Sequence, residues 1–190
     1  MSSRIEWARA YARQAASDWE VYLQLTDRRD APRCHALHFL QMATEKIAKA
    51  YRFRHTNTPE ASLLTRHVGF QAFMRQFLRS PRVLQAYEGR AAQLGAVTRD
   101  CHQLAGEVEK LAPAVGRTDR PQNAEYPWRV AERITAPIDY DFSNLSFVGK
   151  PLSLKFQTTI SSKLPQRARY GAVTARFRDR RPVRCRHVAC

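Results

Sequence analysis

The fold is decided by the stretch Cys34–Tyr51, which reads CHALHFLQMATEKIAKAY. Its apolar side chains recur at steps of three and four residues, at Leu37, Leu40, Ala43, Ile47 and Ala50. This spacing places them on one face of an α-helix, and the polar side chains fall largely beside that face. Asp30 supplies a capping side chain, and Pro32 suits the first turn, where its missing N–H is not needed. The sequence therefore predicts a central amphipathic helix over residues 32–53.

Helical periodicity continues on both sides of this helix. Residues 3–26 carry an apolar stripe, with Ser2 or Ser3 as a cap and Glu6 close behind, the arrangement of a capping box. A polar segment with a proline separates the central helix from residues 60–79. That segment predicts one or two short helices that bring several phenylalanines into the core.

The longest helical pattern covers residues 82–111. Three glycines, Gly89 among them, weaken it by about 1 kcal/mol each relative to alanine and can mark a break. After a turn-rich segment, residues 129–136 are expected to form a last short helix before Pro137. Together the patterns predict an all-α fold, an up-and-down bundle of four to five helices over residues 3–136.

Positive charge is concentrated after the bundle. The chain has 32 Lys and Arg against 17 Asp and Glu, a formal net charge of +15. Residues 150–190 contain eleven of these bases and one acid, net +10, whereas residues 1–149 contain the other 21 bases and 16 acids, net +5. We expect residues 137–190 to be a basic extension, partly disordered or with a weak strand at 152–160. This charge indicates an anionic partner, RNA or DNA before a membrane.

Composition limits the class of protein. With 190 residues, 44% of them hydrophobic and 10% aromatic, the chain resembles a globular domain with an appendage. No run of about 18 apolar residues is present, and the start MSSRIEWARAYARQ lacks the apolar centre of a signal peptide. We therefore expect a cytoplasmic protein without a membrane partner, whose four cysteines are free thiols.

The run Gln41–Tyr51, QMATEKIAKAY, resembles the second helix of HEPN domains, small α-helical bundles whose members often read Q-x-A-x-E-K-x-x-K-A there. Three further pieces follow the family order. The first helix carries an A-x-x-S-D-like element that ends at Asp18, and His67 opens the next helix. Near the end of the bundle, residues 125–128 read EYPW where many members have Arg-Tyr-Pro. The match covers residues 3–130.

The resemblance implies a bundle that often forms a homodimer, with roles around nucleotides, RNA and prokaryotic toxin–antitoxin or defence systems. We therefore expect an RNA- or nucleotide-associated binding module. Two alternatives stay open: a metal-independent endoribonuclease toxin, and a structural partner that docks its second helix on a nucleotidyltransferase subunit. The sequence has no Gly-rich phosphate loop and no His-Glu-x-x-His motif, and we expect no cofactor.

Seven residues are candidates for binding RNA or a nucleotide. Four of them are basic and lie near the end of the central helix: Lys46, Lys49, Arg52 and Arg54. They form either an anion-binding strip or a solvated face. His67 either contacts a ligand or joins two helices by a hydrogen bond. Tyr126 and Trp128 either stack on a base or pack the end of the bundle, and Glu125 beside them reverses the charge of the family's Arg.

Catalytic candidates also follow from the resemblance. HEPN ribonucleases use an Arg followed four to six residues later by a His. The His acts as general acid or base on the ribose 2′-OH, and the Arg holds the scissile phosphate. Here the corresponding helix offers Arg99 and His102 with only two residues between them, a pair that shares a helical face. The alternative is that His102 is an ordinary half-exposed residue. Cys185, His187 and Cys190 fit no common zinc spacing, and we expect no metal site.

Overall fold

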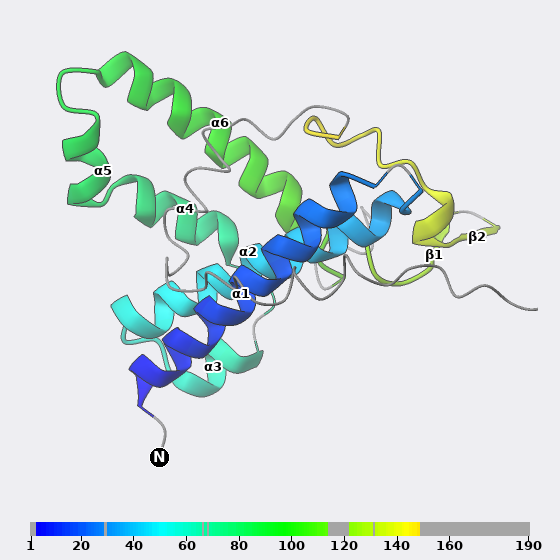
Figure 1. The fold of residues 1–190 in the computed structure, drawn as a ribbon, viewed down its shortest axis with the longest axis horizontal. Helices are drawn as coiled ribbons and strands as arrows, with labels where there is room; N and C mark the ends of the chain where they lie inside the picture. Colours follow the sequence, from blue (N-terminus) through cyan, green and yellow to red (C-terminus); the bar gives the residue numbers. More distant parts are fainter. Residues whose placement is uncertain are drawn as a thin grey trace, which may run out of the picture.

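Two long antiparallel helices form the centre of the molecule (Figure 1). In the computed structural model they are α1 (Arg4–Thr26) and α2 (Arg33–His55), packed together along their length. The structure describes residues 3–28, 30–65, 67, 69–113, 122–130 and 132–148. The other elements in these ranges are α3 (Glu60–Thr65), α4 (Phe70–Leu78), α5 (Pro81–Ala86), α6 (Ala91–Glu109), β1 (Trp128–Val130), β2 (Arg133–Thr135) and the 3-10 helix η1 (Pro137–Asp139). The predicted all-α bundle is confirmed.

The sequence predicts the N-terminal cap of α1 correctly, but not that of α2. At α1 the Glu6 N–H donates to the Ser3 hydroxyl at 3.2 Å, and the Ser3 N–H donates to the Glu6 carboxylate at 2.6 Å, which confirms the capping box. The N-cap of α2 is Pro32, without a side-chain cap. The predicted Asp30 cap is wrong, because its carboxylate accepts instead from the Arg28 guanidinium at 2.7 Å.

The long pattern over residues 82–111 is divided into α5 and α6. Gly89 lies between them with φ of +70°, a backbone conformation that glycine adopts without a steric penalty. α6 packs against both α4 and α2. Figure 1 shows α5 and the start of α6 at the end of the molecule farthest from the α1–α2 pair. Within the described ranges the chain thus forms six α-helices, where the pattern alone predicts four to five.

The segment 129–136 forms a hairpin, and the predicted last helix is wrong. β1 and β2 pair antiparallel, with Trp128 opposite Thr135 and Arg129 opposite Ile134. Three of the six strand residues are β-branched, which favours strand over helix in so short a segment. The segment is also too short to gain helical stability by cooperativity.

One core joins the helices to the hairpin and the residues after it. Leu40, Ala43 and Ala105 are fully buried in it. Phe142 and Leu145, from the region assigned to the basic extension, belong to the same core. Residues 143–148 form turns and a bend, and Phe142 just before them adopts a positive φ of 55° while its side chain stays buried. The bundle core therefore extends past residue 136.

Some expectations fall outside the described residues. These are the expected strand at 152–160, the arginine-rich end of the basic extension, and Cys185, His187 and Cys190. Within the described part, Cys34 and Cys101 are buried free thiols. Among the helices of the described ranges, none combines the length and the apolar character needed to cross a membrane.

Candidate functional site

The residues that carry the family resemblance meet in a polar cluster between α1 and α2. Lys46 of α2 donates to the Asp18 carboxylate of α1 at 2.5 Å, and their side chains are only 15% and 7% exposed. Gln14, one turn before Asp18, donates to the other carboxylate oxygen at 2.9 Å. The A-x-x-S-D-like element thus supplies the counter-ion for a lysine of the second helix.

The second half of this cluster is centred on Glu45. Its carboxylate pairs with Lys49 at 3.0 Å and accepts from the Gln41 amide at 3.1 Å. Lys49 also donates to the Leu64 carbonyl of α3 at 3.3 Å and lies 5.5 Å from the centre of the Tyr11 ring. These contacts attach α3 to the helix pair, because a buried ammonium must satisfy its donors within the protein.

His67 lies beside Glu45 but remains open to solvent. Its Nδ1 is 3.4 Å from a Glu45 carboxylate oxygen, a contact that is an ion pair only when the imidazole is protonated, and its side chain is 61% exposed. It lies three residues before the start of α4. The structure therefore brings His67 to the Glu45–Lys49 ion pair.

The predicted basic strip at the end of α2 is divided by burial. Lys46 and Lys49 are largely buried and ion-paired, Arg52 is half-buried, and Arg54 is exposed. An anion that approached the two lysines would have to compete with Asp18 and Glu45. Their role in binding RNA stays a prediction, and Arg54 is the member of the strip that faces solvent freely.

Arg99 and His102 lie on α6, away from these ion pairs. Arg99 is exposed, and His102 is half-buried with its Nε2 buried and without a hydrogen-bond partner among the described residues. Burial, with a smaller contribution from Asp100, raises the pKa of the intervening Cys101 to about 11, so its thiol is protonated at neutral pH. Within the described part of the chain, no hydrogen bond or ion pair connects Arg99 or His102 to the α1–α2 cluster. Their catalytic role stays a prediction.

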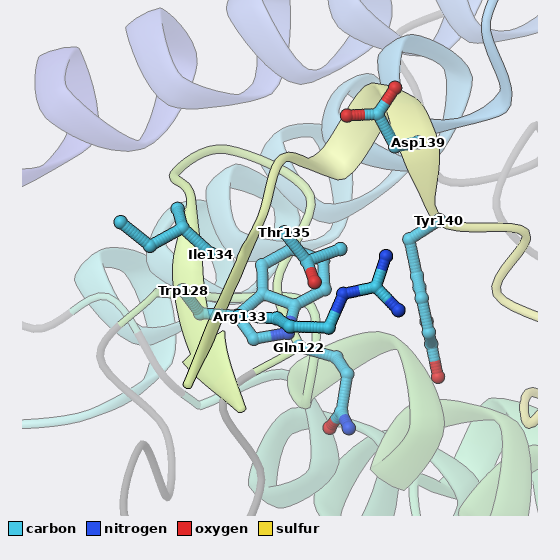
Figure 2. Close-up of a pocket in the computed structure, with 7 residues that line it drawn as sticks. All are labelled: Gln122, Trp128, Arg133, Ile134, Thr135, Asp139 and Tyr140. Atoms are coloured by element: carbon cyan, nitrogen blue, oxygen red, sulfur yellow. The ribbon is translucent and has the colours of Figure 1, made fainter. Parts of the chain in front are cut away.

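A pocket of about 560 Å³ opens beside the β1–β2 hairpin (Figure 2). It is lined by Gln122, Trp128, Arg133, Ile134, Thr135, Asp139 and Tyr140. The hairpin register explains why three of these residues converge. Since Trp128 pairs with Thr135, and residue 130 with Arg133, the side chains of Trp128, Arg133 and Thr135 share one face. Arg129 and Ile134 belong to the other face.

The aromatic wall of the pocket is anchored in the core. The Trp128 ring meets the Tyr140 ring edge-on, with centroids 5.4 Å apart at 86°. Tyr140 meets Phe142 in the same way at 4.9 Å and 81°. Trp128 is 8% exposed and Phe142 is 1% exposed, whereas Tyr140 is half-buried. The wall is therefore rigid, and Tyr140 offers more ring surface than Trp128.

Asn123 orients the chain that leads into β1. Its side-chain oxygen accepts the N–H groups of Glu125 and Tyr126 at 2.9 and 2.6 Å, and its amide donates to the Tyr126 carbonyl at 3.0 Å. Asn and Asp side chains often hold turns in this way. The turn presents Trp128 to the pocket, while Glu125 and Tyr126 are exposed and do not line it.

Arg133 is the cation of the pocket. It is exposed, and no carboxylate of the described residues lies within ion-pair distance of its guanidinium. Figure 2 shows the guanidinium directed to the side of the pocket that Tyr140 closes, and the Asp139 carboxylate directed away from it. In this view the Thr135 hydroxyl is directed toward the Arg133 side chain, on the side opposite Tyr140. The pocket thus combines an aromatic wall, a hydroxyl and a cation without a protein counter-ion.

Of the predicted binding residues, the pocket contains Trp128 alone. The sequence does not predict Arg133 and Thr135 as site residues, because its pattern over 129–136 predicts a helix, and no motif marks Tyr140. Read as a strand, the alternation of Arg133 and Thr135 would have placed them on one face. No family model matches the sequence, and neither a curated protein nor a solved structure matches it.

Proposed function

We propose that this chain is a HEPN-like binding module for RNA or nucleotides, with a role in a prokaryotic toxin–antitoxin or defence system. The observation that carries the binding function is the pocket beside the hairpin, which Arg133 lines together with Trp128 and Tyr140. Two ion pairs among the motif residues support the family resemblance: Asp18 with Lys46, and Glu45 with Lys49.

Aromatic rings and an unpaired guanidinium suit an unpaired nucleotide. Bases of single-stranded RNA stack on or pack against aromatic side chains, each worth about 1–3 kcal/mol. A guanidinium donates two parallel hydrogen bonds to a phosphate, and a charged donor without a protein partner is free to do so. In double-stranded RNA the bases are paired and stacked, so that aromatic side chains cannot reach their faces. We therefore expect this pocket to bind single-stranded RNA more tightly than a duplex.

The charge of the whole chain supports the same partner. A net charge of +15 attracts polyanions from a distance and raises the rate of encounter. Binding through Lys and Arg releases counter-ions from the nucleic acid, so its affinity falls steeply with salt. A structural partner protein without RNA contacts would not show that dependence.

The test is the affinity of the full chain for a short single-stranded RNA and for the duplex of the same sequence, measured by fluorescence anisotropy over a salt series. We expect the logarithm of the affinity to fall linearly with the logarithm of salt, by about 0.7 per phosphate contact for single strands. We also expect tighter binding of the single strand. Absence of RNA binding at low salt would overturn the proposal, and equal affinity for the duplex would assign the binding to phosphates alone.

A further inference from the structure

The geometry points to a specific ligand for the hairpin pocket: one nucleotide that carries a single phosphate. We propose that the pocket binds a nucleoside monophosphate unit, either free or as an unpaired nucleotide within RNA, with the phosphate on Arg133 and the base against Tyr140, the more exposed of the two aromatic residues that line it. This inference rests on the proposed function and names the ligand of that site.

The volume of the pocket suits a ligand of the size of one nucleotide. The pocket has a volume of about 560 Å³, and small-molecule sites in proteins span about 300–1,000 Å³. An unpaired nucleotide can turn its base into such a space while the rest of the strand remains on the surface. A base in a duplex would first have to leave its stack, which costs a few kcal/mol.

The charges of the pocket select one phosphate. Among the described residues that line it, Arg133 is the only cation and Asp139 the only acid. One guanidinium matches one phosphate by two parallel hydrogen bonds. The second and third phosphates of a triphosphate would find no further cation among the described residues of this lining. We therefore expect no gain in affinity from added phosphates.

Polar side chains complete the contacts to the sugar or base. The Thr135 side chain lines the pocket, and Gln122 borders it from the other side (Figure 2). A hydroxyl and an amide can each donate and accept, so they suit ribose hydroxyls and base edges. The pocket is preformed, because the hairpin pairing positions Arg133 and Thr135, and the core holds Trp128 and Tyr140. Such preorganisation lowers the entropy lost on binding.

The experiment is titration calorimetry of the full chain with adenosine 5′-monophosphate, adenosine and adenosine triphosphate, and with a short single-stranded RNA. Arg133→Gln is the test variant, and Arg129→Gln is its control, since both arginines are exposed on the same hairpin but belong to opposite faces. We expect Arg133→Gln to weaken binding of the monophosphate about tenfold or more, as loss of a charge-assisted hydrogen bond implies. Arg129→Gln leaves it nearly unchanged.

The results with the different ligands distinguish a failure of this inference from a failure of the proposed function. The monophosphate should bind at least about tenfold more tightly than adenosine, and the triphosphate no more tightly than the monophosphate. Equal losses in the two arginine variants, or a gain with each added phosphate, would overturn the inference while RNA binding still supports the module. Binding of the monophosphate without RNA identifies a free nucleotide as the ligand. Binding of neither overturns both proposals.

Discussion

At the scale of single residues, the Arg4 side chain of α1 caps the C-terminal end of α2. Its guanidinium donates to the carbonyls of Phe53, Thr56 and Thr58 at 3.1, 2.7 and 2.9 Å, and to that of Arg52 at 3.3 Å. The last carbonyls of a helix have no partner within it. One side chain from the start of α1 therefore satisfies the end of α2 and fixes the two helices in register.

Replacement of Arg4 tests this role. We expect Arg4→Ala to lower the free energy of unfolding by about 2–3 kcal/mol, because charged hydrogen bonds contribute about 1.5–3 kcal/mol and these are partly shielded from water. Arg9→Ala is the matched control, since Arg9 is exposed on the same helix. Urea denaturation followed by circular dichroism measures both. Equal losses in the two variants would contradict the capping role.

Tyr22 makes stability depend on pH in the alkaline range. Burial raises the pKa of Tyr22 from 10.0 to about 12. Between pH 10 and about 12 the folded state keeps the Tyr22 proton, which the unfolded chain releases. The contribution of Tyr22 to the free energy of unfolding is therefore complete below pH 10 and falls as the pH rises toward 12. Tyr22→Phe removes this contribution. Denaturation of both proteins across the window should show a shallower decline in the variant, and parallel declines would refute the assignment.

At the scale of elements, the break between α5 and α6 is set by one backbone conformation. Gly89 occupies a positive φ of 70°, whereas Gly95 lies inside α6. A side chain at Gly95 would meet only the Arg99 guanidinium, at 3.8 Å. The same residue type therefore has opposite effects at the two positions: it permits the turn at one and weakens the helix at the other.

The two glycines form a matched pair of substitutions. Gly89→Ala should destabilise by about 1–2 kcal/mol, because a Cβ is disfavoured in the left-handed region. Gly95→Ala should stabilise by about 0.5–1 kcal/mol, because alanine is the better helix former and its Cβ makes an ordinary contact. Thermal unfolding of both variants reports the sign. Changes of the same sign would disprove this account of the break.

At the scale of the whole molecule, the candidate catalytic pair does not line the hairpin pocket. Arg99 and His102 belong to α6, whereas the pocket is built by the hairpin and η1. The buried Nε2 of His102 leaves a single imidazole nitrogen for proton transfer. A general acid or base must come within hydrogen-bond reach of the ribose hydroxyl, and His102 is not among the residues that line the pocket.

Incubation of the full chain with total cellular RNA in EDTA examines this directly. We expect the RNA to stay intact, and an Arg99→Ala/His102→Ala variant to behave like the parent protein. The buried nitrogen and the short spacing between the two residues are the reasons. Metal-independent cleavage that disappears in the variant would establish the endoribonuclease alternative in place of the binding module.

Much of the helical architecture is readable from residues close in sequence. The three- and four-residue periodicity of α1 and α2, the capping box at Ser3 and the break near Gly89 are local features, because helices form hydrogen bonds within a few residues. The all-α class and the two central helices were predictable for that reason. The pattern in residues 129–136 was misread because a segment this short has no decisive periodicity of its own.

By itself, then, the sequence determined where the long helices run and which face of each is apolar. Only the tertiary structure decided that Lys46 pairs with Asp18, since this contact depends on how α1 and α2 pack. The Glu45–Lys49 pair is local to α2, but its burial also depends on packing. The tertiary structure also decided that Trp128, Arg133 and Tyr140 share a pocket. Cross-strand pairing and core packing create that site, and both join residues whose proximity is absent from local periodicity.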